Sequence, residues 1–281
     1  MLIVEQIHGM QSWSETERRS GKRIVLVPTM GFLHEGHLSL VRDGRKRGEQ
    51  LVVSIFVNPA QFAPEEDYQS YPRDLERDRK LLDMEKVDLL FRPSAEEMYP
   101  KGYQTHVEVE KLSPLLCGAS RPGHFRGVAT VVAKLFNIVR PHVAIFGSKD
   151  YQQLQIVRRV VKDLSFDVEV VAHPTVREGD SLAMSSRNIY LSQDERRAAQ
   201  SLYRSLLKAQ SMFRKGERKR EQILCSVRNE LDKEPLVQVE YVELCDPDSL
   251  EKIERIENEA LLALAVKIGK ARLIDNAILK P

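Results

Sequence analysis

The stretch IVLVPTMGFLHEGH, residues 24–37, joins a short apolar run to a glycine-containing turn and then to a helix predicted over residues 38–46. In open α/β sheets, ligands collect where a strand ends and the next helix begins. Free N–H groups at a helix N-terminus attract anions, and His34 and His37, three residues apart, can reach one ligand there. We therefore interpret this stretch as a phosphate-binding turn whose two imidazoles stabilise charge on a phosphoryl oxygen.

Two other interpretations of the histidine pair are open at this point. The imidazoles could cap the helix without binding a ligand, or they could hold a metal ion. Zinc would need a third protein ligand, and Glu35 points elsewhere on a helix that has already begun. Gly36, between the histidines, would let a base or sugar pack closely on the backbone. The chain contains neither GxGxxG nor a P-loop motif, so the common dinucleotide and P-loop fingerprints are absent.

Outward from this turn, residues 23–172 alternate short β-branched runs with longer amphipathic runs, which indicates strands separated by crossover helices. The strands are nearly continuous in apolar residues, as expected for a parallel sheet that is covered on both faces. The pattern predicts a Rossmann-like, doubly wound α/β sheet. Its strands are expected at residues 24–27, 51–57, 87–91, 143–146 and 168–172, and its helices at 38–46, 75–85, 127–139 and 151–163.

After Pro174 the pattern changes to that of a small α+β domain. Ser192, followed three residues later by Glu195, predicts a capping box and a charged helix that reaches about residue 215. The expected domains are a Rossmann-like domain over residues 1–174 and a smaller one over 175–281, which share a cleft. The smaller domain adds a helix at 219–232 and strands at 237–244, 261–268 and 271–279.

The composition argues against several classes of protein. The 281 residues include 43 Lys and Arg against 41 Asp and Glu, and a net charge of +2 does not suit non-specific binding to nucleic acid. RNA binding through the basic cluster at residues 214–220 is an alternative, although Glu217 interrupts the cluster. Three widely spaced cysteines do not indicate a disulfide framework or a zinc cluster. With no leader pattern and no apolar run of about 20 residues, we expect a cytoplasmic protein without a membrane span.

The turn at residues 24–37 resembles the HxGH signature of the nucleotidyltransferase superfamily, and five further segments narrow the resemblance to the pantoate–β-alanine ligase family. In chain order these segments are FVNPAQF (56–62), YPR (71–73), RPGHFRGV (121–128), GSKDYQQL (147–154) and LAMSSRN (182–188). The similarity runs over essentially the whole chain. Ser148 and Ser181 depart from the family pattern, which often has an acidic or amide residue and a glycine there, so the local shape of these two loops is in question.

The resemblance implies an ATP-dependent ligase. Pantoate and ATP would form a pantoyl adenylate with loss of pyrophosphate, and β-alanine would then attack the acyl carbon to give pantothenate and AMP. The implied catalytic residues are His37, His34, Lys149 and Arg187. The implied ATP-binding residues are Met30, Gly31, His34, Gly36, His37, Gly147, Lys149, Asp150, Val176, Met184, Ser185, Ser186 and Arg187. The implied binding residues for pantoate and β-alanine are Gln61, Gln153 and Asn58.

These assignments agree with the chemistry of the side chains. The Lys149 ammonium follows a buried strand and can reach phosphate, although an isolated lysine would more often be solvated. Asp150 can accept hydrogen bonds from ribose hydroxyls or act only as a helix cap. An arginine with two serine hydroxyls at residues 185–187 suits triphosphate oxygens, and we expect this loop to close over ATP. The glutamine amides offer both a donor and an acceptor to pantoate.

Further expectations concern the cofactor and the assembly. ATP chemistry usually requires Mg²⁺, which binds few protein ligands. Asp78 is a candidate ligand, although an acidic residue on an arginine-rich helix is more often an ion-pair partner. The family resemblance suggests a homodimer that acts on small molecules. The main alternative is another member of the HxGH superfamily, such as a cytidylyltransferase or a phosphopantetheine adenylyltransferase.

Overall fold

A computed structural model describes residues 1–64 and 66–281 of the chain. The chain separates into two units. Two short segments that precede Pro174 belong to the same unit as the C-terminal part of the chain. Unit 1 comprises Met1–Ser113, Arg121–Ser148 and Gln153–Pro174, and unit 2 comprises Pro114–Ser120, Lys149–Gln152 and Thr175–Pro281.

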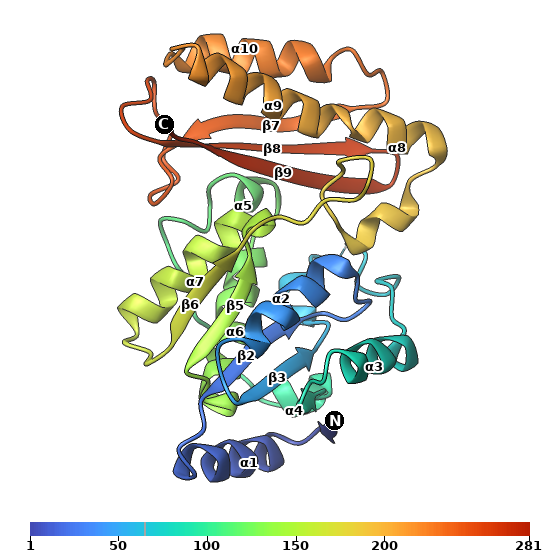
Figure 1. Cartoon of the computed structure of the whole chain (residues 1–281), viewed down its shortest axis with the longest axis vertical. Coiled ribbons are helices and arrows are strands. Elements are labelled where there is room, and N and C mark those ends of the chain that lie inside the picture. The colour runs from blue at the N-terminus through green and yellow to red at the C-terminus, as the bar shows by residue number, and fades with distance from the viewer. Residues whose placement is uncertain (65) are drawn as a thin grey trace. The chain divides into compact units, whose positions relative to one another are not determined.

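Unit 1 contains a six-stranded parallel sheet, which confirms the predicted doubly wound α/β fold (Figure 1). The strand order is β1-β4-β3-β2-β5-β6. The edge strand β1 (Leu2–Val4) was not predicted, because three residues are too few to show a pattern; it pairs with β4. The other strands lie close to their predicted positions and are β2 (Ile24–Thr29), β3 (Gln50–Ile55), β4 (Leu89–Phe91), β5 (Val143–Gly147) and β6 (Glu169–His173).

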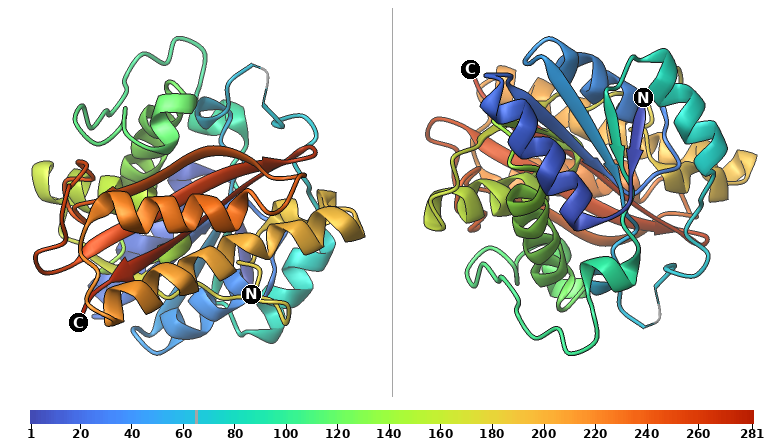
Figure 2. Two further views of the ribbon diagram at one scale, coloured as in Figure 1. Left: turned by 90° about the horizontal axis from the view of Figure 1, so that it is seen from above. Right: turned by 90° about the horizontal axis from the view of Figure 1, so that it is seen from below.

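Helices cover the sheet because each buries an apolar stripe against it. α2 (Glu35–Arg45) packs on β2, β3 and β5, and α1 (Ile7–Arg19) lies beside α6 (His124–Val139), as the view from below in Figure 2 shows. α1 was not predicted, since the Gln6 N-cap makes no side-chain capping bond. The remaining elements of this part of the chain are the 3₁₀ turn η1 (Pro59–Gln61), α3 (Leu75–Met84), α4 (Ala95–Met98) and α7 (Tyr151–Asp163).

The strand order reverses at β2, which places a ligand site at its end. β2 pairs with β3 on one side and with β5 on the other, although the chain runs from β2 to β3 and returns to β5 only later. In doubly wound sheets, ligands bind outside the carboxyl ends of the strands at such a switch point. The turn that follows Thr29 therefore occupies the position that the fold reserves for a ligand.

Unit 2 is the predicted α+β arrangement. An antiparallel sheet of order β7-β8-β9 packs its apolar face under the helices, where Leu206 and Val227 meet Leu264 in one core (Figure 2). The elements are the 3₁₀ turns η2 (Ser148–Asp150) and η3 (Ser186–Tyr190), α5 (Cys117–Ser120), α8 (Gln193–Ala199), α9 (Ser201–Arg214), α10 (Arg220–Leu231), β7 (Gln238–Cys245), β8 (Ala260–Ile268) and β9 (Ala271–Leu279).

The predicted single helix from Ser192 to about residue 215 is wrong in one respect. The Ser192–Glu195 capping box is present, but the helix divides at Gln200 into α8 and α9. The Gln200 N–H donates to the carbonyl of Arg197, three residues back, at 3.3 Å. This tighter turn interrupts the α-helical bonding pattern without a glycine or proline, so composition alone carries no signal for the break.

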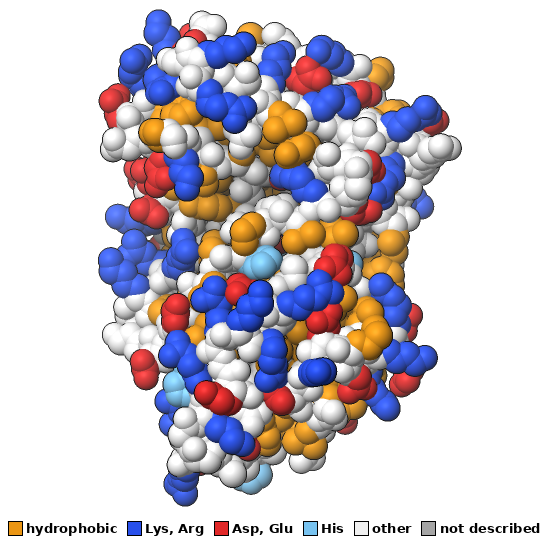
Figure 3. All heavy atoms as spheres, in the orientation of Figure 1, with side chains coloured by type: hydrophobic (Ala, Val, Ile, Leu, Met, Phe, Trp, Pro, Cys, Tyr) orange, Lys and Arg blue, Asp and Glu red, His pale blue; other side chains and the backbone are white. Residues whose placement is uncertain are grey.

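The surface carries charges of both signs. On the face shown in Figure 3, basic and acidic side chains are interspersed over the molecule, as a net charge of +2 leads one to expect. Within the described ranges, no helix has both the length and the apolar character needed to cross a membrane.

Candidate active site

The turn after β2 is built from two successive residues with left-handed backbone conformation. The Thr29 hydroxyl donates to the carbonyl of Ser54 at 2.8 Å and accepts from the Gly31 N–H at 3.2 Å, which ties the end of β2 to β3. Gly31 has φ +83° and Phe32 has φ +50°. A left-handed conformation costs a residue with a side chain about 1–2 kcal/mol, so Phe32 stays there only because neighbours hold it.

Asp78, from the first turn of α3, holds this backbone. Its two carboxylate oxygens accept hydrogen bonds from the N–H groups of Phe32 and Leu33, both at 2.7 Å. The residue is 1% exposed. Burial raises the pKa of the Asp78 carboxyl, and the hydrogen bonds from Leu33 and Phe32 oppose that effect without cancelling it. Asp78 is therefore a buried support of the histidine turn. The expected ion pair is present, with Arg77 at 3.9 Å, but the Asp78 carboxylate is not solvated.

His34 and His37 begin α2 together. His34 is the N-cap, its N–H donates to Nδ1 of His37 at 3.3 Å, and the two rings lie 4.0 Å apart with a tilt of 33°. A main-chain N–H can only donate, so Nδ1 of His37 must accept and the neutral ring carries its proton on Nε2. The capping interpretation is thus correct as geometry. It also orients His37 as an Nε2–H donor at a helix N-terminus, where anions bind.

The structure brings Met30, Asn58 and Gln61 together beside this turn. The Gln61 Nε2 donates to Sδ of Met30 at 3.1 Å, and its Oε1 accepts from Nδ2 of Asn58, also at 3.1 Å. Asn58 is only 1% exposed. Its Nδ2 also donates to the carbonyl of Gly127, and its Oδ1 accepts from the Tyr99 hydroxyl. With its amide occupied in this way, Asn58 is better placed to orient Gln61 than to touch a substrate.

Gly127 allows η1 to pack directly on α6. A Cβ at this position would lie 2.1 Å from the Ala60 carbonyl oxygen and 2.7 Å from the Gln61 Cα. Both atoms are main chain, so neither can move aside without displacing η1. The segment RPGHFRGV (121–128), one of those that carry the family resemblance, thus contains a glycine that the site geometry requires.

Replacing Gly127 with Ala should destabilise the protein by about 2 kcal/mol or more, because overpacking costs about 1–3 kcal/mol and here it strikes backbone. In an ordinary helix the same change stabilises by up to about 1 kcal/mol, so the expected sign is reversed. Denaturant unfolding measures the difference. The control is Gly179→Ala, where a Cβ meets nothing within 4 Å. A Gly127→Ala protein as stable as the parent would contradict the close approach.

The remaining predicted residues that follow β5 lie on short turns. Gly147 ends β5, Lys149 and Asp150 lie in η2, and Gln153 is a partly exposed residue on the first turn of α7. The Lys149 carbonyl accepts from Asn276, and its ammonium lies 3.9 Å from Asp150. The neighbouring Gln152 is buried instead and bonds to Leu115 and Cys117 within unit 2.

The predicted serine and arginine residues lie on a segment that unit 2 holds firmly. Met184 and Val176 are joined by a main-chain hydrogen bond, and Ser185 caps η3 by accepting from the Arg187 N–H. Arg177, next to Val176, forms a bidentate ion pair with the buried Asp275 at 2.6 and 2.9 Å. Lys149 and Ser185 line the same small hollow of unit 2. The predicted closure of this loop over ATP stays a prediction.

The glycine that the family resemblance predicts at position 181 would suit the backbone there. Ser181 has φ +72°, in the left-handed region that favours glycine. Its N–H donates to the Glu178 carbonyl, and its own carbonyl accepts from Arg177. Serine therefore keeps the turn at a modest conformational cost.

A cavity of about 230 Å³ opens against Met30, Gly31 and Phe32 of the histidine turn. Its two arginines are already engaged. Arg73 donates to the carbonyls of Tyr68, Gln69 and Tyr71, and Arg92 pairs with Glu5. The cavity therefore does not have the features of a second phosphate site.

The basic cluster at residues 214–220 does not support RNA binding. Arg218 donates to the Phe213 carbonyl at 2.6 Å and stacks over its ring, and Arg220 pairs with Glu243 at 2.8 Å. These side chains hold the end of α9 and the beginning of α10 in place. Their role is structural, as is usual for basic helix ends.

Several residues beside the turn carried no functional signal in the sequence. Arg121 and His124 were quoted only as part of a motif, yet they bond to each other and to the Gln61 carbonyl. Thr29 and Tyr99 had no signal of their own. The conjunction of Arg, Gly and His before a helix was the available clue, but its partner lies about 60 residues away in the chain.

Comparison with known proteins gives consistent matches. The family model described as pantoate–beta-alanine ligase matches residues 2–278. Pantothenate synthetase of Thermotoga petrophila is 56% identical over 279 residues, covering 99% of this chain and 100% of that protein. The enzyme of Geobacter sulfurreducens is 54% identical and covers 99% of both. These matches do not favour a cytidylyltransferase or a phosphopantetheine adenylyltransferase.

Solved structures agree with the sequence relatives. The crystal structure of pantothenate synthetase from Thermus thermophilus superposes with a TM-score of 0.95 at 47% identity and covers 100% of both chains. Pantoate–beta-alanine ligase from Francisella tularensis, complexed with beta-gamma ATP and beta-alanine, gives a TM-score of 0.81 at 34% identity, covering 99% of this chain and 97% of that one. With motif order, fold and full-length identity in agreement, the chain belongs to the pantoate–β-alanine ligase family.

Proposed function

We propose that this ligase activates pantoate at the turn between β2 and α2. A carboxylate oxygen of pantoate attacks the α-phosphorus of ATP, and the bond to pyrophosphate breaks. The amine of β-alanine then attacks the acyl carbon, loses a proton and releases AMP, which leaves pantothenate. The observation that carries this proposal is the stacked His34–His37 pair at the N-terminus of α2, at the switch point of the sheet.

Each side chain has a role that its chemistry permits. The His37 Nε2–H and the N–H groups of the first turn of α2 stabilise the negative charge that develops on the phosphates, and His34 shares this work. Gln61 and Gln153 hold pantoate through their amides. In unit 2, we assign phosphate oxygens to Lys149 and Arg187 and to the hydroxyls of residues 185–186.

The other ATP residues contribute close approach and apolar contact. Gly31, Gly36 and Gly147 present main chain to the nucleotide, and Asp150 accepts from ribose hydroxyls. Met30, Val176 and Met184 supply apolar surface. Because the Met30 sulfur already contacts the Gln61 amide, ATP and pantoate would lie next to each other in unit 1.

Mg²⁺ fits the proposal as a companion of ATP and not as a protein-held ion. Both carboxylate oxygens of the buried Asp78 accept main-chain hydrogen bonds, so its support of the histidine turn would compete with binding of a magnesium ion. In the part of the chain that the structure describes, no group of three or more His, Cys, Asp or Glu residues could hold a metal ion. Magnesium commonly binds through substrate phosphates and water. On family grounds alone, we also propose a cytoplasmic homodimer.

Isotope exchange tests the activation step. Labelled pyrophosphate should exchange into ATP when pantoate is supplied and β-alanine is withheld, because adenylation is reversible while the adenylate stays bound. Omitting pantoate should abolish the exchange, and adding β-alanine should yield one AMP for each pantothenate. Exchange that needs no pantoate, or AMP formation without exchange, would refute an acyl-adenylate intermediate and point to another HxGH chemistry.

A further inference from the structure

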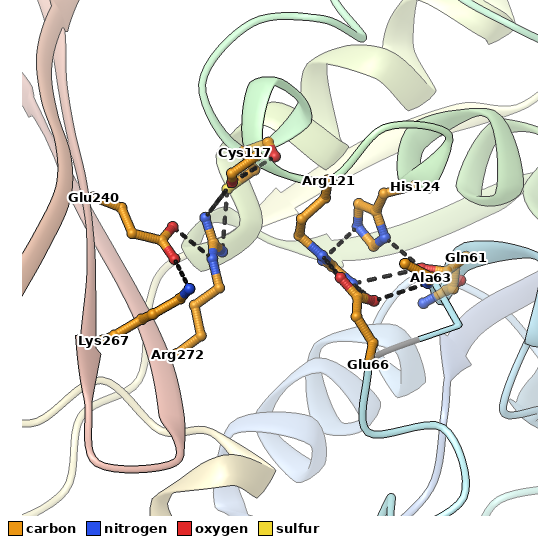
Figure 4. Close-up of polar contacts among 10 residues, drawn as sticks. Gln61, Ala63, Glu66, Cys117, Arg121, His124, Glu240, Lys267 and Arg272 are labelled. Atoms are coloured by element: carbon orange, nitrogen blue, oxygen red, sulfur yellow. Dashed lines mark hydrogen bonds and ion pairs between the residues drawn. The ribbon is translucent and has the colours of Figure 1, made fainter.

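Residues 121–127, which lead into the first turn of α6, contact the main chain of Gln61. The His124 Nδ1 lies 2.8 Å from the Gln61 carbonyl oxygen, and its Nε2 lies 3.0 Å from Nη1 of Arg121 (Figure 4). Arg121 in turn binds both carboxylate oxygens of Glu66, at 2.6 and 2.7 Å. Burial favours a raised pKa for Glu66, but the hydrogen bonds from Arg121 outweigh it and hold the pKa below its usual range.

The direction of each hydrogen bond in this group follows from its partners. A guanidinium can only donate and a main-chain carbonyl can only accept, so Nε2 of His124 accepts while Nδ1–H donates. His124 is therefore neutral, in the Nδ1–H form. A second proton on Nε2 would face the Arg121 guanidinium directly. With both ring nitrogens held by these contacts, His124 is suited to orient Gln61 and not to transfer protons.

A second set of contacts orients the Gln61 side chain. The Tyr99 hydroxyl and the Ala60 N–H donate to Oδ1 of Asn58, so its Nδ2 must donate to Oε1 of Gln61. The Gln61 Nε2 is thereby turned toward Met30, whose thioether is a weak acceptor. An amide held in this orientation is a committed donor, which suits a ligand that presents carboxylate or hydroxyl oxygens.

We infer that Arg121 and His124 are positioning residues that set the Gln61 amide for pantoate. The inference rests on the proposed role of Gln61 and assigns the RPGHFRGV block, which that proposal leaves without a function. η1 meets α6 at Gly127 with no room for a side chain, and the bond from His124 to the Gln61 carbonyl adds a second attachment between η1 and the beginning of α6. Small displacements of a substrate-binding group are costly, because binding and reaction need the atoms in register.

The test compares two substitutions at His124. His124→Leu removes the donor to Gln61, whereas His124→Asn can place its amide N–H where Nδ1–H was. In the pyrophosphate exchange assay, we expect the leucine variant to raise the KM for pantoate about tenfold or more, with the KM for ATP within about twofold of the parent. The asparagine variant should recover most of the pantoate affinity.

His142→Leu is the matched control. His142 accepts from the Ile24 N–H through Nδ1, at the amino end of β2 and away from the ligand end of the sheet. Its loss should lower the melting temperature without changing the ratio of the two KM values. If His124→Leu behaves in the same way, or if His124→Asn restores nothing, the positioning role is rejected.

Two more variants keep the test decisive. If His124→Leu does not fold, Arg121→Lys retains the charge but cannot reach Glu66 with two nitrogens and His124 with a third, and it should raise the pantoate KM alone. An unchanged pantoate KM would overturn the inference. Gln61→Ala tests the binding role of Gln61 apart from the positioning role of His124. If it leaves the pantoate KM unchanged, the proposed function of Gln61 fails. An effect of Gln61→Ala without one of His124→Leu removes only the positioning role.

Discussion

Replacing His37 with Asn is expected to slow pantoyl adenylate formation by about 10²–10³-fold while the protein stays folded. Asparagine can still accept the His34 N–H through Oδ1, so the cap of α2 is kept. Its side chain is too short to replace the Nε2–H donor, so the charge that develops on the phosphates loses a stabilising partner. Single-turnover measurement of adenylate formation, with pantoate binding measured separately, distinguishes a slower reaction from weaker binding.

The control for this experiment is His8→Asn, at an exposed position on α1. It should keep parental rates. Parental chemistry in His37→Asn would remove His37 from the mechanism. If His37→Asn instead loses its fold, and its lower rate follows from that loss, the residue serves only to cap α2. Circular dichroism and thermal unfolding detect such a loss.

Replacing Asp78 with Ala is expected to lower the free energy of unfolding by about 2–6 kcal/mol, because two main-chain N–H groups lose a buried acceptor at about 1–3 kcal/mol each. The left-handed Phe32 would no longer be held, and the turn that carries His34 would shift. Activity of the folded protein should fall about 100-fold, as expected when a site is misplaced by about 1 Å. Denaturant unfolding and the exchange assay measure the two effects.

Asp74→Ala is the matched control, one turn earlier at the N-cap of α3. It removes an exposed capping carboxylate and should cost about 1 kcal/mol without affecting adenylation. If Asp78→Ala proved no worse than Asp74→Ala, Asp78 would not be the support of the histidine turn.

The Asp78 effect should also depend on pH, with a definite sign. The pKa of Asp78 is raised by burial in the folded protein. An acid whose folded-state pKa is raised contributes stability that is fully present below its unfolded pKa and lost as the pH rises through the folded pKa. The stability difference between the parent and Asp78→Ala should therefore be larger at about pH 3, below the unfolded pKa, than near neutral pH. The opposite slope would mean that the hydrogen bonds outweigh burial.

Much of the fold could be predicted from local patterns. Apolar runs located the strands from β2 to β9 to within a few residues. In the parallel sheet this follows because strands covered on both faces are nearly continuous in apolar residues, whereas β7 to β9 were recognised from β-forming residues around the Gly269 turn. β1 and α1 were missed for different reasons: β1 has only three residues, and α1 lacks a side-chain cap that would mark its beginning. The break at Gln200 was missed because the hydrogen-bonding pattern changes there while the amphipathic sequence pattern continues.

The chemistry of the site was encoded in residue types, since imidazoles, an ammonium and amides at strand ends limit what the chain can bind. The state of those groups was not encoded. Asp78 bonds to Leu33 across 45 positions, and His124 bonds to Gln61 across 63. A hydrogen-bond partner so distant sets a tautomer, an amide orientation or a carboxylate pKa only after the chain has folded. The order of residues, through its resemblance to the ligase family, indicated the reaction class, whereas tertiary packing decided which atom of each side chain donates and which accepts.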